Sequence, residues 1–180
     1  MRDASPCRTS PIWLAVLCVS TVFVTGTLVR AEDWPTWRGP THDGISAETG
    51  WSPEAVAAGK VLWRAQVGKG HSSFAVAGGR AYTLGNSDNK DTIFCFDAET
   101  GAEIWTKSYA SRAGNYPAPR STPPGDGTLV YTLSREGHLH CLDAASGEET
   151  WTKKVATEIP RWGLASSPIV EGDLVVVNAG

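Results

Sequence analysis

Short runs of apolar, β-branched and aromatic residues follow one another along most of the chain, and turn residues separate them. No window shows the 3.6-residue spacing of apolar positions that predicts a sustained helix. Each group of four runs therefore predicts four short strands joined by tight turns. The runs occupy residues 73–77, 80–85, 92–97 and 103–109, and then 119–122, 128–134, 138–143 and 149–155.

The two groups are copies of one repeat. Residues 95–105 read CFDAETGAEIW, and 46 residues later residues 141–151 read CLDAASGEETW. A third, partial copy begins at residues 166–168, which match residues 121–123 at a distance of 45. Four strands at this spacing are typical of a β-propeller blade rather than of a helical solenoid or a leucine-rich repeat.

We therefore predict an all-β fold, a β-propeller of four-stranded antiparallel blades. About two and a half blades are present, whereas a closed ring needs at least about four. The ring is thus expected to be incomplete, and the chain is interpreted as an N-terminal fragment of a longer protein. Taken alone, such a piece would expose open sheet faces and edges that favour association.

The sequence of each copy also predicts which residues form and stabilise the turn after the third strand. An Asp at the end of the third strand can accept N–H groups of the following turn, and a Gly there can take a left-handed conformation. The Trp that follows recurs once per copy, which predicts an indole laid flat between adjacent sheets. The residues of this structural motif are Asp97, Thr100, Gly101, Trp105, Asp143, Ser146, Gly147 and Trp151.

The pattern x-x-Asp-x-x-[Thr/Ser]-Gly-x-x-x-Trp resembles the tryptophan-docking motif of the pyrroloquinoline-quinone (PQQ) type propeller repeat. That repeat occurs in quinoprotein alcohol dehydrogenases and in BamB-like assembly factors. Cys95 and Cys141 stand where the motif usually has Ala. Residues 33–40, DWPTWRGP, are similar to the opening of a subgroup of exported PQQ-like propellers of bacteria.

This resemblance implies a fold more than a chemistry, because the fold is shared by enzymes and scaffolds. Family dehydrogenases hold the quinone beside a disulfide of two adjacent cysteines, coordinate calcium and use an Asp base. The chain has no adjacent cysteine pair and no Cys-x-x-Cys-His haem site. No Asp can be matched to the base, since Asp97 and Asp143 belong to turns.

The sequence therefore favours a non-catalytic, exported binding or scaffolding module of the cell envelope, without a cofactor. The alternative is part of a PQQ-dependent quinoprotein alcohol dehydrogenase-like oxidoreductase. Under that alternative PQQ and calcium would be cofactors, and the catalytic residues would lie outside this chain. A third hypothesis is a lectin-like propeller in which Trp34 or Trp37 stacks on carbohydrate.

The N-terminus predicts export. Arg2 and Arg8 precede an apolar run over 12–29 that ends in Val29-Arg30-Ala31, a small-x-small cleavage pattern. We expect a signal peptide over 1–31, a Trp-rich segment over 32–59 that packs on the propeller, and PQQ-like repeats over 60–180. The expected location is periplasmic or secreted, with no membrane span after signal cleavage; an uncleaved anchor is the alternative.

The net charge of the chain limits the kinds of partner that it can bind. The chain carries 16 basic and 19 acidic side chains, and removal of the signal would leave 13 against 18. This balance excludes attraction to nucleic acid or to anionic lipid. We expect instead a protein partner or a small ligand at one propeller face. The connections that lead into the inner strands form a possible rim for it, at Arg112, Tyr116, Arg120, Arg161 and Trp162.

Three other patterns are assigned structural roles. His138 and His140 share a strand face as metal ligands often do, but no third ligand is evident. The oxygen-rich residues 86–91 lack the spacing of a calcium loop and are expected to form a hairpin. The Ser-Ser or Ser-Thr pairs at 72, 121 and 166, with His71 beside the first, are expected to bond backbone groups at the inner strands.

Overall fold

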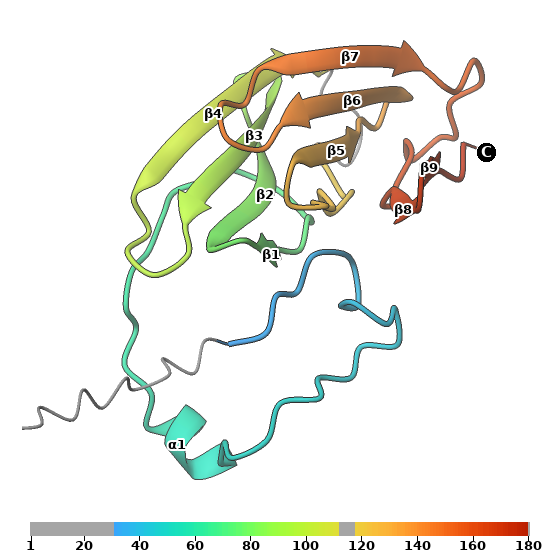
Figure 1. The fold of residues 1–180 in the computed structure, drawn as a ribbon. Helices are drawn as coiled ribbons and strands as arrows, with labels where there is room; N and C mark the ends of the chain where they lie inside the picture. The colour runs from blue at the N-terminus through green and yellow to red at the C-terminus, as the bar shows by residue number, and fades with distance from the viewer. Residues whose placement is uncertain (1–30, 112–117, 180) are drawn as a thin grey trace, which may run out of the picture. The chain divides into compact units, whose positions relative to one another are not determined.

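The structure is a computed structural model that describes residues 31–111 and 118–179. Residues 1–30, which hold nearly all of the expected signal peptide, and the rim residues Arg112 and Tyr116 lie outside this part. The described chain is nearly all β and forms three separate antiparallel sheets (Figure 1). The prediction of an all-β propeller with an open ring is thereby confirmed.

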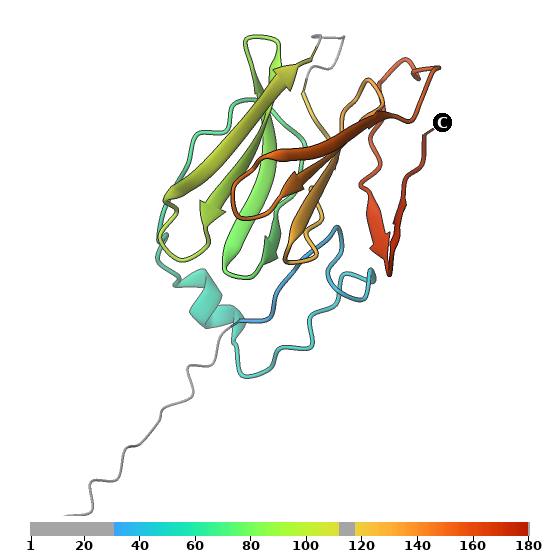
Figure 2. The ribbon, with the colours of Figure 1, turned by 45° about the horizontal axis from the view of Figure 1, so that its top comes forward.

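The sheets follow the repeat. The first has the order β1-β2-β3-β4, the second β5-β6-β7, and the third β8-β9. Figures 1 and 2 show the first two standing side by side, with β4 and β7 as their last strands. The bounds are β1 Ala75–Ala77, β2 Arg80–Ser87, β3 Lys90–Asp97, β4 Glu103–Ala110, β5 Leu129–Leu133, β6 His138–Asp143, β7 Glu149–Lys154, β8 Ile169–Glu171 and β9 Leu174–Val176.

The two copies share one strand register. Cys95 on β3 lies opposite Trp105 on β4, and Cys141 on β6 lies opposite Trp151 on β7. A register shift follows directly after each of the two cysteines. The sequence repeat is therefore also a repeat of backbone geometry, down to the position of the bulge.

The main core lies between the first two sheets. Strands β2, β3 and β4 contribute Tyr82, Ile93 and Trp105, and the second copy contributes Val130 and Leu142 to the same buried cluster. Strand β3 carries buried apolar side chains at Ile93, Cys95 and Phe96, a pattern typical of a strand that is covered on both faces. A smaller cluster around residues 133, 139, 156 and 164 is packed against hydrophobic residues of the third copy.

The first strand of the second copy is absent. Residues 119–122, where we expect it, form no strand, and only an isolated bridge joins Gly125 to Val130. Pro119, Pro123 and Pro124 crowd this segment, and proline has no N–H to give to a strand ladder. The segment remains buried despite the lost ladder.

One short helix departs from the strand-only expectation. Helix α1 spans Pro53–Ala57; the Ser52 hydroxyl accepts the N–H of Ala55 at 3.0 Å, and proline occupies the first turn. Ser followed by Pro and Glu is the sequence signal that predicts such a start. No helix in the described residues has the length and apolarity needed to cross a bilayer.

Backbone hydrogen bonds join the N-terminal segment to the first and second copies of the repeat. Trp34 and Val76 exchange two backbone hydrogen bonds of 2.8 Å, and the Gly125 N–H donates to the Pro35 carbonyl oxygen at 3.0 Å. Trp37 and Trp51, in contrast, are 54% and 65% exposed. Of these three indole-bearing residues, Trp34 is the one that pairs with β1 through its backbone.

Candidate functional site

A recess of about 570 Å³ lies where the N-terminal segment meets the starts of the three copies. This volume is typical of small-molecule sites, which span about 300–1,000 Å³. Its wall combines two guanidinium groups, two imidazoles and an indole with a few small or hydroxyl-bearing residues. The recess is lined by Thr36, Trp37, Arg38, His42, His71, Arg120, Ala165, Ser166, Ser167, Pro168 and Ile169.

A tight turn places the N-terminal residues of the recess. Arg38 and Gly39 have φ values of 68° and 79°, and the Gly39 N–H donates to the Thr36 carbonyl oxygen at 3.1 Å. A Cβ on Gly39 would lie 2.7 Å from the ring of Trp34, so only glycine fits there. Because Trp34 is fixed to β1, the turn holds Trp37 and Arg38 at the recess wall.

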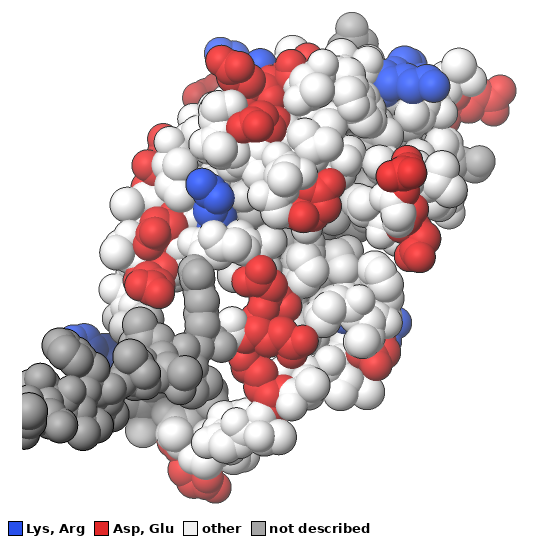
Figure 3. Space-filling model, in the orientation of Figure 1, with Lys and Arg blue, Asp and Glu red and all other residues white. Residues whose placement is uncertain are grey.

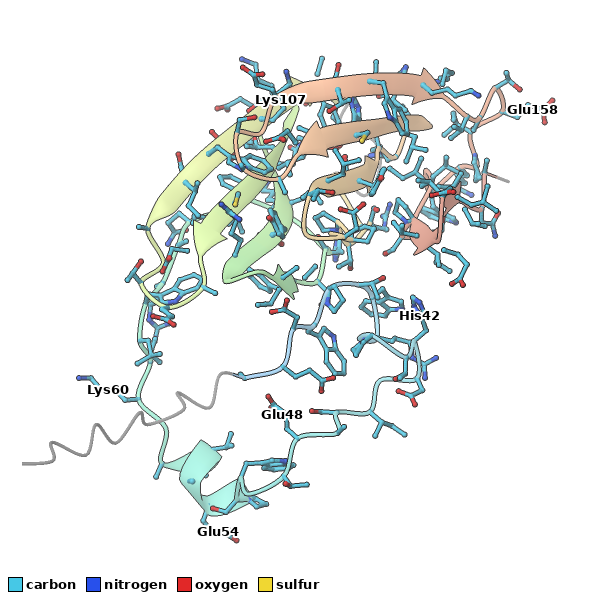
Figure 4. The ribbon with its side chains drawn as sticks, viewed as in Figure 1. His42, Glu48, Glu54, Lys60, Lys107 and Glu158 are labelled. Atoms are coloured by element: carbon cyan, nitrogen blue, oxygen red, sulfur yellow. The ribbon has the colours of Figure 1, made fainter. Side chains whose placement is uncertain are left out.

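The next loop fixes Arg38 and His42. The Arg38 Nη2 donates to the Asp43 carbonyl oxygen at 2.7 Å, and His42 has a φ of 58°. The N–H of Ile45 and the hydroxyl of Thr41 bond the Asp43 carboxylate and lower its pKa. Figure 4 shows His42 on the bend of the segment that approaches β8 and β9.

The rim residues on the other side of the recess form one contact chain. The Arg120 Nη1 donates to the Trp162 carbonyl oxygen at 2.6 Å. The Arg161 guanidinium lies 4.8 Å from the centre of the Trp162 ring, a distance that gives a cation–π contact. The structure thus brings Arg120, Arg161 and Trp162 together, although only Arg120 lines the recess; Arg112 and Tyr116 fall outside the described residues.

Hydroxyl groups join the starts of successive copies. The Ser73 N–H donates to Thr122 Oγ1 at 3.3 Å, and the Thr122 N–H donates to Ser167 Oγ at 2.9 Å. His71 is held beside them, because its N–H donates to the Pro119 carbonyl oxygen at 2.9 Å. The repeated Ser and Thr residues therefore act as backbone links between copies.

The Asp and Gly residues of the repeat motif build nearly identical turns. Asp143 Oδ1 accepts the N–H of Ala145 and the N–H and hydroxyl of Ser146, at 2.8 to 2.9 Å. These bonds, first of all those from Ser146, lower the pKa of Asp143. Asp97 Oδ1 makes the matching bonds to residues 99 and 100, and Gly101 and Gly147 both have a φ of 72°.

The Trp residues of the motif differ in burial. Trp105 is 7% exposed, and its Nε1 donates to the Ala144 carbonyl oxygen of the next copy at 3.0 Å. Trp63 makes the same bond to Ala98 of the first copy, also at 3.0 Å, although residues 60–66 form no strand. Trp151 is 39% exposed. Trp63 and Trp105 thus dock on the following copy.

The two paired histidines lie at the seam between the first two sheets. His140 Nδ1 is 2.8 Å from Glu149 Oε2, and the ring stacks on Tyr109 with centroids 4.5 Å apart. The ring of His138 lies 6.3 Å away. Across residues 31–111 and 118–179, no three His, Cys, Asp or Glu side chains group closely enough to hold a metal ion.

Sequence reasoning missed part of the recess. Of its Arg and His side chains, Arg120 was singled out as a rim residue and His71 only as the neighbour of a Ser pair. Arg38 and His42 belong to the N-terminal segment, which shows no strand periodicity. The sequence signal that could have indicated the turn at the recess was Trp-Arg-Gly at residues 37–39, where Gly39 directly follows Arg38.

The recess is equipped for binding. Arginine and histidine offer N–H donors, arginine also offers positive charge, and the indole offers an apolar face. Among the residues that line it, none is Asp, Glu or Cys. Figure 3 shows that acidic side chains outnumber basic ones on the face in view, so the recess differs in charge from much of the visible surface.

Comparison with known proteins agrees with this fold. Residues 54–120 and 112–180 match the family model described as outer membrane protein assembly factor BamB. No curated protein matches the chain. Among solved structures, the quinohemoprotein alcohol dehydrogenase from Comamonas testosteroni is 21% identical, with a TM-score of 0.64 over 79% of this chain and 22% of its own.

Two further structures are similar. A europium-containing methanol dehydrogenase is 17% identical, with a TM-score of 0.62 over 79% of this chain and 26% of its own. BamB from Moraxella catarrhalis is 26% identical, with a TM-score of 0.42 over 55% of this chain and 27% of its own. The chain spans roughly a quarter of the length of these proteins. Since the family model covers residues 54–180, the chain belongs to the BamB family of PQQ-like propeller repeats.

Proposed function

We propose that this chain is part of an exported, non-catalytic PQQ-like propeller that binds a protein partner or a small ligand in the bacterial cell envelope. The observation that carries this proposal is the recess, where Arg38, Arg120 and Trp37 meet from distant parts of the chain. The nearby Ser and Thr groups are engaged in backbone links. Such a wall holds a ligand but offers no activated nucleophile.

The same proposal assigns a role to each part of the chain. Residues 1–31 direct export, residues 32–59 pack on the propeller and close one side of the recess, and residues 60–180 provide the repeats. The backbone pairing of Trp34 with Val76 supports the second assignment. The description of the matched family as an outer membrane assembly factor supports a place in the cell envelope.

The alternative is a quinoprotein-type oxidoreductase whose catalytic residues lie outside this chain. The likeness to the Comamonas testosteroni enzyme over 79% of the chain favours it, but at 21% identity that likeness concerns the fold alone. Under this alternative the repeats would be a scaffold for PQQ and calcium held by other residues.

A turnover assay separates the two functions. The full-length protein of which this chain is a part is incubated with PQQ, calcium, a primary alcohol and a dye that accepts electrons. The binding function predicts no dye reduction above that of a heat-denatured sample. Dye reduction that requires both PQQ and the alcohol would overturn the non-catalytic proposal and establish the oxidoreductase. A glycan array tests the lectin-like hypothesis, which requires binding that is lost in Trp34→Ala or Trp37→Ala.

A further inference from the structure

We propose that the recess binds a small organic anion, with its carboxylate or phosphate group at Arg38 and Arg120 and its apolar body against Trp37 and Ile169. This inference rests on the proposed binding function and specifies the chemical class of the ligand. Its basis is the charge, the exposed apolar surface and the volume of the recess.

The first argument is charge. The chain as a whole has 19 acidic against 16 Lys and Arg side chains, yet the recess wall holds two Arg and no acidic residue. A concave surface lined by one sign of charge attracts ligands of the opposite sign. Asp43 offsets part of the charge of Arg38, since the two lie close enough for Arg38 to lower the Asp43 pKa.

The second argument is the geometry of the donors. Each guanidinium donates a hydrogen bond to a backbone carbonyl oxygen, Arg38 to that of Asp43 and Arg120 to that of Trp162. These bonds limit the rotation of both side chains, so less freedom is lost when an anion binds. Arginine also presents several N–H groups in a planar fork, which matches the oxygens of carboxylate and phosphate.

The third argument is apolar surface and size. Trp37 and Ile169 remain 54% and 42% exposed at the recess wall. A recess of about 570 Å³ is far larger than an inorganic anion needs. A ligand that joins an anionic group to a ring or a short hydrocarbon body would cover this surface and gain the free energy of its burial.

The test compares matched ring compounds. Benzoate and phenyl phosphate serve as the two anionic probes, and benzamide, which has nearly the shape of benzoate without its charge, is the neutral control. Calorimetric titration of the purified chain should give saturable binding of benzoate, of phenyl phosphate or of both. Benzamide should bind about tenfold more weakly or not at all. The preferred anion then identifies the ligand as a carboxylate or a phosphate compound.

Variants locate the site. Arg120→Gln and Arg38→Gln should each weaken binding of the preferred anion by about fivefold or more, and Arg120→Lys should fall between. Arg64→Gln, an exposed arginine that does not line the recess, should bind as the unaltered chain does. Thermal unfolding of each variant shows whether the fold is kept. If Arg38→Gln unfolds the N-terminal turn, the binding measured with Arg120→Gln and Arg120→Lys decides whether the anion binds in the recess.

Three results would overturn the inference: equal binding of benzoate and benzamide, anion binding that neither Arg120 variant changes, or absence of binding by both anions. These results are independent of the turnover assay. Dye reduction with PQQ would remove the non-catalytic function and leave the anion site standing, whereas a failed titration would remove the anion site alone.

Discussion

Gly147 of the second copy lies directly against the indole of Trp105 from the first. A Cβ built on Gly147 would come 2.5 Å from Cδ2 of that ring. Gly101 and Trp63 repeat the relationship at 2.4 Å. The glycine of the turn therefore serves two purposes, a left-handed backbone and a flat surface for the indole of the preceding copy. Through this contact, the Trp of one copy packs against the turn of the next copy.

Gly147→Ala should lower the free energy of unfolding by about 2–4 kcal/mol. Its φ of 72° strains alanine by about 1–2 kcal/mol, and the added methyl group must displace Trp105. Gly78→Ala is the matched control, because Gly78 has a φ of 57° and nothing within 4 Å of its Cβ position. The free energy of unfolding of Gly78→Ala should fall only by the part that comes from backbone strain. Urea unfolding followed by Trp fluorescence measures both, and equal losses would contradict the steric role of Gly147.

Asp91→Asn should stabilise the protein at neutral pH. Asp91 is fully buried, its Oδ1 accepts the amide of Asn86 at 2.7 Å, and its Oδ2 has no hydrogen-bond partner among the residues that the structure describes. Burial raises the pKa of this carboxyl, although Asn86, Ser111 and Arg135 act in the opposite direction. A neutral amide of the same shape avoids the buried charge.

The pH dependence of this effect follows from the sign of the shift. A folded-state pKa above the usual value of about 4 means that the folded state holds the proton more tightly than the unfolded state. The contribution of Asp91 to stability is therefore full below the unfolded pKa and is lost as the pH rises through the folded pKa. The advantage of Asp91→Asn should thus appear at pH 7 and shrink toward pH 3 in thermal unfolding. A gain that is equal at both pH values would contradict the burial of a charged carboxylate as its cause.

Cys95 and Cys141 should not react with a thiol reagent while the protein is folded. Both are free and fully buried, and burial raises the pKa of Cys95 to about 11 and that of Cys141 in the same direction. The reactive species is the thiolate, which is scarce and covered here. In a chain with Cys7→Ser and Cys18→Ser, the reagent should modify neither thiol until urea is added. Modification of either cysteine in the native state would show that the packing around its sheet opens.

The sequence predicts the repeat well because its turns are encoded locally. Asp97 and Gly101 are four residues apart, and their bonds and φ depend on neighbours that the repeat itself supplies. The strands follow for the same reason, since apolar alternation and turns bound them on both sides. Where local chemistry changes, as with the prolines at 119, 123 and 124, the predicted strand is lost.

The recess could not be predicted in the same way. Arg38 and Ile169 are more than 130 residues apart, and they share a wall only because Trp34 pairs with Val76 and the Ser and Thr links align the copies. No periodic pattern in the sequence indicates that residues so far apart in the chain lie close together. Arg120 was recognisable because it lies in a connection between copies, where propellers gather their functional residues.

Trp105 and Trp151 allow the seam contact to be measured separately from the rest of the motif. Each pairs with a cysteine in register and lies near one tyrosine, Trp105 at 6.0 Å from Tyr82 and Trp151 at 6.2 Å from Tyr131. They differ on the other side, where Trp105 is covered by the next copy and Trp151 is 39% exposed. Trp105→Phe should therefore cost about 2–3 kcal/mol, from the lost bond to Ala144 and the space left beside it, whereas Trp151→Phe should cost less than about 1 kcal/mol. Urea unfolding of the two variants under one set of conditions checks the difference, and similar losses would mean that the indoles act within their own sheets rather than between them.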